Sequence, residues 1–191
     1  LINQRGHFSP ESPMKHFLFG YAALLCGGLA HATDFHVYYL GGQSNMDGYG
    51  YVNQLPDELK GPVEGIPVFH GNPGRDNQPV DGRGVWSTLQ PGHGVGFSSD
   101  GKTNRYSGRF GAELTFARTI AAQHPDRRIA IIKYSRGGTS IAADAAGNFG
   151  CWEPDFVGTN GVNQYDHFLA TIRGAFAVTD IDGDGEADRL I

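Results

Sequence analysis

Two short apolar segments, each followed within three residues by a pair of glycines, constrain the fold of this chain more than any other feature. Residues 35–40 and 128–134 are rich in β-branched, aromatic and aliphatic side chains. Short apolar runs of this kind predict strands that are buried inside a sheet. Between them, apolar residues recur at helical spacing and predict a helix over residues 109–123. A strand, a helix and a second strand in this order predict parallel pairing of the two strands.

The rest of the chain adds one strand and one helix to this pattern. An apolar run at residues 66–70 predicts a third strand, and residues 163–177 predict a second helix. The apolar face of this helix is expected to carry Phe168, Ile172 and Phe176. The segment 49–106 is otherwise rich in Gly, Pro, Asn and Asp, so we expect loops that cover a site. The expected fold class is α/β with a central parallel sheet, whose ligands bind beyond the carboxyl ends of the strands.

The N-terminal segment has the pattern of a secretory signal. Met14 is followed by a basic residue, a short apolar run and an Ala-x-Ala ending, which together predict a signal peptide at residues 14–32. The apolar run is too short to span a bilayer as a helix. Residues 1–13 lie upstream of this signal and are left out of the expected fold. We expect a mature domain at residues 33–191 that is secreted or periplasmic, with no membrane attachment after cleavage.

Charge and cysteine content exclude several classes of partner and site. The chain carries 15 Lys and Arg against 20 Asp and Glu, a formal net charge of −5 at pH 7. Since no basic patch is present to attract phosphate, nucleic acid is not an expected partner. Cys151 is the single cysteine outside the expected signal, so neither an internal disulfide nor a metal–thiolate site is expected.

The segment with the clearest chemistry is the turn after residues 35–40, which reads Gly41-Gly42-Gln43-Ser44-Asn45-Met46. A serine just after a buried strand can lift its hydroxyl clear of the sheet, and its own N–H can help to form an oxyanion hole. The spelling differs from the usual G-x-S-x-G of a nucleophile elbow. A serine in a glycine-rich turn is most often only a turn residue. By itself, this turn leaves both interpretations of Ser44 open.

Three blocks in one order make the sequence resemble a known family. They are Gly42-Gln43-Ser44-Asn45-Met46, Phe110-Gly111-Ala112-Glu113-Leu114 and Lys133-Tyr134-Ser135-Arg136-Gly137-Gly138-Thr139-Ser140. These blocks are similar to those of the sialate O-acetylesterase-like domain, carbohydrate esterase family 6, a branch of the SGNH or GDSL-type hydrolases. Ala112 departs from the usual proline of the second block. The resemblance covers residues 34–191 and implies a three-layer, flavodoxin-like sandwich around a central parallel sheet.

The resemblance also implies a function and several residue roles. Ser44 would be the nucleophile of a serine esterase that removes acetyl groups from carbohydrate of the sialate or xylan type, with no cofactor for catalysis. The N–H of Ser44 and that of Gly138, or alternatively Gly137, would form the oxyanion hole. Glu113, at the start of the predicted helix, is expected to brace the Ser44 turn rather than to act in catalysis. The residues expected to position the acyl group or the turn are Gln43 and Asn45.

A serine nucleophile needs a base, and no such base stands out here. The family supplies it from a C-terminal Asp-x-x-His and adds a Gln from a Q-G-E-S-D-like block to the oxyanion hole. Neither block occurs in residues 1–191. The eight histidines are expected to have surface or structural roles, His70 and His93 in loops. We therefore expect a domain truncated at its C-terminus that is itself inactive.

Two other functions fit the same sequence. One is an SGNH esterase or lipase with a different acyl specificity. The other is a non-catalytic module that binds carbohydrate or calcium and has lost the base. The aromatic residues that could stack on a sugar ring, or could equally be packing residues, are Tyr49, Tyr51, Trp86 and Trp152.

An acidic segment near the end of the chain predicts a structural calcium site. Carboxylates at alternating positions, with glycine at the sixth, match the first part of an EF-hand-like loop. The expected ligands are Asp180, Asp182, Asp184 and Asp188. Position 12 of the loop would be Ile191 instead of the usual Glu. The alternative is an acidic surface turn without an ion.

Overall fold

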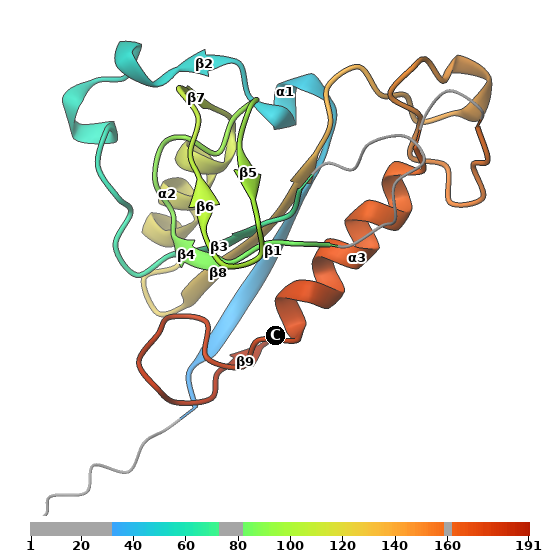
Figure 1. The fold of residues 1–191 in the computed structure, drawn as a ribbon. Coiled ribbons are helices and arrows are strands. Elements are labelled where there is room, and N and C mark those ends of the chain that lie inside the picture. Colours follow the sequence, from blue (N-terminus) through green and yellow to red (C-terminus); the bar gives the residue numbers. More distant parts are fainter. Residues whose placement is uncertain (1–31, 73–81, 159–161) are drawn as a thin grey trace, which may run out of the picture.

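The computed structural model describes residues 32–72, 82–158 and 162–191. The upstream segment 1–13 and all but the last residue of the expected signal peptide 14–32 lie outside these described residues. None of the helices in the described part has the length and apolar composition that a membrane span requires. The fold is α/β, with a mixed, curled five-stranded sheet and helices packed against it (Figure 1).

The main sheet has the strand order β4-β3-β8-β1-β9. In this order the strands span Trp86–Thr88, Pro67–His70, Arg128–Ser135, Asp34–Gly42 and Arg189–Leu190. β1 and β8 pair in parallel from Phe35↔Arg128 to Gly42↔Ser135, as their patterns predict. β3 is parallel to β8, and β9 is parallel to β1, whereas β4 is antiparallel to β3. The sheet is therefore mixed rather than all-parallel, because β4 returns along the edge of β3 instead of crossing over.

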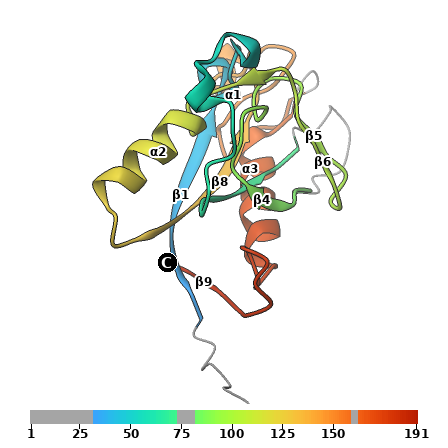
Figure 2. The same ribbon diagram turned by 90° about the vertical axis from the view of Figure 1, so that its left-hand side faces the viewer.

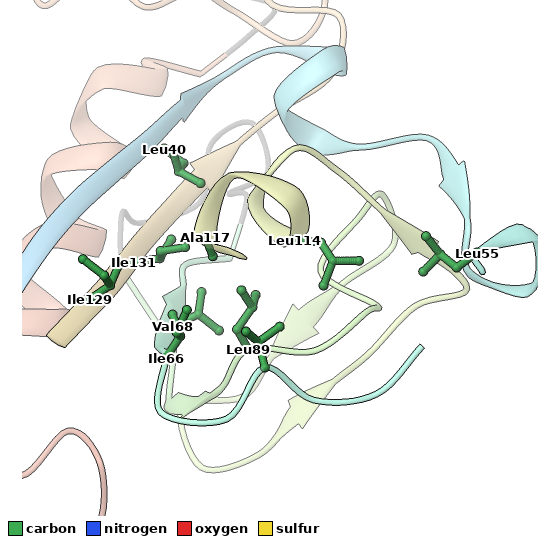
Figure 3. Close-up of a cluster of buried hydrophobic side chains, with 10 residues drawn as sticks. Leu40, Leu55, Ile66, Val68, Leu89, Leu114, Ala117, Ile129 and Ile131 are labelled. Carbon is green, nitrogen blue, oxygen red and sulfur yellow. The ribbon is translucent and has the colours of Figure 1, made fainter. Parts of the chain in front are cut away.

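Helix α2 (Glu113–Gln123) packs on one face of this sheet. Its Leu114 and Ala117 are both 0% exposed and lie in one buried apolar cluster with side chains of β1, β3 and β8 (Figure 3). Burying a leucine side chain contributes ~2 kcal/mol. The sheet residues of this cluster are Leu40, Val68, Ile129 and Ile131.

α2 begins at Glu113 and not at residue 109 as the spacing predicts. The preceding Arg109–Phe110 form the short strand β7, which pairs antiparallel with β2 (Gly50–Tyr51). Pairing with a distant segment therefore removes the first turn of the predicted helix.

Helix α3 (Gln164–Phe176) lies on the opposite side of β1 and β8 from α2 (Figure 2). Its Ala175 packs with Phe69 and Ile132 in a second buried cluster. Of the three residues expected on its apolar face, Ile172 packs against this cluster and Phe168 against Trp152, but Phe176 is 47% exposed. The buried residues are Gln164, His167, Thr171 and Ala175. Polar residues are tolerated on this face because the Thr171 hydroxyl donates to the carbonyl of His167 at 2.9 Å.

The long segment 49–106 consists mainly of connections, as predicted, with more short elements than the one strand expected. Within it β5 pairs with β6, and its β2 pairs with β7, which lies just beyond it. The remaining short elements of the described residues are α1 (Ser44–Asp47), β5 (Ser98–Ser99), β6 (Asn104–Arg105) and the 3₁₀ turns Val52–Gln54, Asp57–Leu59 and Ala143–Ala145.

Candidate active site

Ser44 lies just after β1, at the carboxyl end of the strand. The strand ends at Gly42, and the single-turn helix α1 begins two residues later (Figure 1). The side-chain oxygen of Gln43 accepts the Ser44 N–H at 2.8 Å and the Ser44 hydroxyl at 2.5 Å. Ser44 is partly exposed, while Gln43 and Asn45 are exposed. The hydroxyl is thus within reach of a ligand and is held by its neighbour.

The Gly137-Gly138 turn lies directly beside Ser44, because β8 runs parallel to β1 and ends at the same edge. The Arg136 N–H donates to the carbonyl of Gly42 at 3.0 Å. A methyl group added at Gly137 would lie 3.8 Å from the Cα of Ser44. The structure therefore brings the two glycine turns of the sequence pattern together.

The three candidate oxyanion donors differ in how their N–H groups are engaged. The Gly137 N–H donates to Asp47 Oδ2 at 3.1 Å, and the Ser44 N–H donates to Gln43. Within the described residues, the Gly138 N–H makes no hydrogen bond. Gly138 has a φ of +79°, and a methyl group there would come within 2.7 Å of the Phe149 ring, so glycine is required. A substrate oxygen could therefore accept a hydrogen bond from the Gly138 N–H without displacing a partner among the described residues.

Glu113 belongs to a buried polar network behind the Ser44 turn. It forms an ion pair with Lys133 of β8, with 2.6 Å between Nζ and Oε2 and both side chains 0% exposed. Its other oxygen accepts the Gly111 N–H at 2.9 Å. The Lys133 ammonium also donates to the carbonyls of Asp47, at 3.3 Å, and His93, at 2.8 Å. Glu113 therefore reaches the turn through Lys133 and not by accepting N–H groups of the turn itself.

Burial also changes the pKa of Lys133 in this network. Burial lowers the pKa of Lys133, and the charge and hydrogen bond of Glu113 oppose this effect. The sequence pattern assigned no role to Lys133, which begins the third block, or to Asp47. Their roles depend on contacts between segments far apart in the chain, and no local signal marks such contacts.

His70 and His93, expected in loops, are buried beneath the site. Their Nδ1 atoms lie 3.2 Å apart, and both rings stack on Phe97. Burial, with a further contribution from the Lys133 charge, lowers the pKa of His93 to about 3. The same two causes lower the pKa of His70 well below its usual range. Both rings are therefore neutral at neutral pH, and they serve as packing residues.

An apolar pocket of about 480 Å³ opens beside Gln43. Its walls include Trp152 and Phe168, whose ring centroids lie 5.9 Å apart, and Ile141. The Trp152 Nε1–H donates to the Thr139 hydroxyl at 3.0 Å, which holds the indole in place. A rigid aromatic wall therefore stands next to the Ser44 turn.

The other aromatic residues considered for stacking on a sugar have different surroundings. Trp86 packs against Phe69, with 5.6 Å between ring centroids. Tyr51 lies under the guanidinium of Arg109, 3.5 Å from the ring centroid. The Tyr49 hydroxyl lies close to Gly137, 3.1 Å from a methyl group added there. Of the four, Trp152 and Tyr49 border the Ser44 turn.

The acidic loop 180–188 connects α3 to β9, at the opposite end of β1 from Ser44 (Figure 1). Carboxylate oxygens of Asp180, Asp182 and Asp188 lie within 4.8 Å of one another. Asp184 is outside this group and accepts the Glu186 N–H at 2.9 Å. One oxygen of Asp188 is buried without a hydrogen-bond partner among the described residues. The loop thus brings together three of the four predicted ligands.

Comparison with known protein families shows to which family this chain belongs. Residues 34–183 match the family described as "SASA: Carbohydrate esterase, sialic acid-specific acetylesterase". The chain belongs to this family. The matched range includes Ser44, Glu113 and the Gly137-Gly138 turn, and ends within the acidic loop.

Some solved structures are similar to this chain at low sequence identity. A protein from Arabidopsis thaliana is 15% identical, with a TM-score of 0.46, over 84% of this chain and 56% of that one. NanS is 20% identical, with a TM-score of 0.44, over 78% of this chain and 51% of that one. The chain thus spans about half the length of these two structures. No curated protein sequence matches it.

Proposed function

We propose that this protein is a serine esterase that removes O-acetyl groups from carbohydrate through an acetyl-serine intermediate at Ser44. Membership of a carbohydrate esterase family supports the reaction class. The observation that carries the role of Ser44 is the meeting of its turn with the Gly137-Gly138 turn at one edge of the sheet. Helices on both faces of that sheet are consistent with the three-layer SGNH sandwich, which we propose as the fold of the whole domain.

In the proposed reaction, Ser44 loses its proton to a base as its oxygen attacks the acetyl carbonyl carbon. The Gly138 N–H, joined by the Ser44 N–H once Gln43 turns away, holds the oxyanion of the tetrahedral intermediate. Each such donor contributes about 3 kcal/mol to lowering the barrier. As the bond between the acetyl carbon and the sugar oxygen breaks, the protonated base gives its proton to that oxygen, which leaves as a hydroxyl. Water then releases acetate from Ser44 by the same steps. No cofactor enters this sequence of steps.

The base and the sugar site complete the proposal. The family pattern assigns the base to an Asp-x-x-His, a motif that residues 1–191 do not contain, so activity is tested in a version that carries it. The pocket beside Gln43 is of a size typical for small ligands. Its wall of Trp152 offers an apolar surface to the face of a sugar ring.

A panel of chromogenic esters and acetylated sugars tests this function. We expect acetyl esters to be hydrolysed with a kcat/KM at least about tenfold higher than butyryl or octanoyl esters, a difference of ~1.4 kcal/mol in the barrier. Acetate release from O-acetylated sialic acid or acetylated xylan would identify the sugar. A preference for octanoyl esters would favour the SGNH lipase alternative. Sugar binding without hydrolysis would favour a non-catalytic module.

We also propose that the acidic loop binds calcium, in a protein that is secreted or periplasmic as the 14–32 segment predicts. Three convergent carboxylates and the unpartnered Asp188 oxygen fit a hard cation that prefers oxygen ligands. Arg128 already offsets part of the charge, since it pairs with Asp182 at 2.8 Å. The binding is therefore expected to be in the weak range of extracellular calcium loops, with a Kd on the order of 10⁻⁴ to 10⁻³ M.

Calcium at about 100 times its Kd is expected to stabilise the fold by ~2.7 kcal/mol and to raise Tm by several degrees. Melting in calcium, in magnesium and in chelator measures this difference. Asp180→Asn should remove it, whereas Asp144→Asn in an exposed turn serves as the matched control and should keep it. Equal Tm values in calcium and chelator would identify the loop as an acidic turn held by Arg128.

A further inference from the structure

Asp47, the last residue of α1, links the Ser44 turn to the Gly137-Gly138 turn. Its Oδ2 accepts the Gly137 N–H at 3.1 Å, and its Oδ1 accepts the Ser135 hydroxyl at 3.3 Å. Its backbone carbonyl accepts from the Lys133 ammonium at 3.3 Å. Asp47 and Gly137 are 90 residues apart in the chain, so this is a tertiary contact between two site segments.

We propose that Asp47 is a positioning residue that sets the geometry of the oxyanion hole, an inference that rests on the function proposed above. By accepting the Gly137 N–H, the carboxylate takes that group out of the reaction. It also fixes the Gly137 backbone relative to Ser44, which leaves the next N–H, that of Gly138, for the substrate oxygen. A misplacement of about 1 Å in such a site can cost about 100-fold in rate, so this contact matters for catalysis.

The electrostatics around Asp47 indicate that its charge does not stabilise the fold. Burial raises the pKa of Asp47, opposed by the Gly137 hydrogen bond, the Lys133 charge, the Ser135 hydrogen bond and the Arg136 charge. A folded-state pKa above the ordinary value means that the protein is stabilised by protonating Asp47 and loses that stability as pH rises through this pKa. The ionised carboxylate therefore lowers stability at neutral pH.

The charged and titratable groups that face Asp47 come from each neighbouring element. Lys133 and Arg136 belong to β8 and the turn after it, Tyr49 follows α1, and Glu113 stands behind Lys133 at the start of α2. The two cations offset a negative charge that would otherwise oppose an oxyanion beside Ser44. The geometry of the hydrogen bond, more than the charge of Asp47, is thus the useful feature.

Two substitutions of Asp47, made in a version of the protein that carries the Asp-x-x-His, test the proposal. Asp47→Ala removes the acceptor, and we expect kcat for an acetyl ester to fall by roughly 10- to 100-fold with KM changed less than about threefold. Asp47→Asn keeps a side-chain carbonyl for the Gly137 N–H, so kcat should stay within about threefold of the parent. Its Tm at pH 7 should not fall, because the costly charge is removed.

Asp100 provides a matched control. Like Asp47, it accepts a backbone hydrogen bond through its carboxylate, here from the N–H groups of Lys102 at 2.8 Å and Thr103 at 2.7 Å, in an exposed turn. Asp100→Ala should leave kcat and KM unchanged. A normal kcat in Asp47→Ala would overturn the proposal, as would equal losses in Asp47→Ala and Asp47→Asn.

Hydrogen exchange of residues 136–140 gives a second measurement that does not depend on turnover. Exchange of the Gly137 amide should rise at least about tenfold in Asp47→Ala and stay close to the parent in Asp47→Asn, because a bonded amide exchanges only when its bond opens. Unchanged exchange in Asp47→Ala would refute the positioning role. If the parent protein releases no acetate, the proposed function fails, and the exchange data alone decide whether Asp47 holds the turn.

Discussion

Ser44→Ala is expected to lower kcat for acetyl esters by roughly 10⁴- to 10⁶-fold in a version of the protein that carries the Asp-x-x-His. Without the hydroxyl no acetyl-serine can form, and only the oxyanion donors remain to assist attack by water. Acetate release from a chromogenic ester measures the loss. Trapping with a slow acetyl donor, followed by mass spectrometry, should locate the acetyl group on Ser44 in the parent and nowhere in the variant.

The fold should be unaffected by this substitution. Ser44 is partly exposed and, among the described residues, its hydroxyl is bonded only to Gln43, so stability should change by less than about 0.5 kcal/mol. Ser98→Ala, in the exposed part of a short strand, is the matched control and should keep full activity. A folded Ser44→Ala protein that still hydrolyses the ester would show that the nucleophile lies elsewhere.

Lys133→Met is expected to destabilise the fold by about 3–5 kcal/mol, which is a large part of the stability of a domain. The substitution leaves the Glu113 carboxylate buried without its ion-pair partner, and the carbonyls of Asp47 and His93 lose a donor. For a domain of this size, Tm should fall by on the order of 10 °C. Urea unfolding followed by tryptophan fluorescence measures the change in free energy.

Two further variants test whether burial is the cause. Lys133→Met combined with Glu113→Leu removes both charges and should recover most of the loss, because no charge is left unpaired. Arg189 and Asp34 form a pair at the same 2.6 Å distance, but their side chains are 68% and 42% exposed. Arg189→Met should therefore cost less than about 1 kcal/mol. A similar cost for Lys133→Met would contradict the prediction.

Local pattern was enough to predict the elements that lie at the centre of the fold. β1, β3 and β8 lie within two residues of the predicted bounds, because short apolar runs bounded by polar or glycine residues have few other ways to be buried. α3 lies within one residue of its prediction, since Asn163 caps it with bonds to the N–H groups of Tyr165 and Asp166. The parallel pairing of β1 and β8, which this order predicts, places the two glycine turns at one edge of the sheet.

Long-range pairing explains where the predictions departed from the structure. α2 begins late because Arg109–Phe110 pair with Gly50–Tyr51, and β4 is antiparallel because it returns along β3. The buried face of α3 includes Thr171, a polar residue that a regular apolar stripe would not contain. A Cβ added at Gly71 would clash with the Thr171 side chain, and one added at Gly82 would clash with the helix backbone at Ala170. Helical periodicity cannot show which neighbours face a helix.

By itself, the sequence determined the parallel β1–β8 core, the place of Ser44 after a strand and the resemblance to a family. Each of these depends on residues close together in the chain. Only the tertiary structure decided how the site is held. The Gly137 N–H is bonded to Asp47, 90 residues away, and Glu113 reaches the Ser44 turn through Lys133. Such contacts depend on which side chains the fold buries together, and burial makes each buried polar group require a partner that no local pattern identifies.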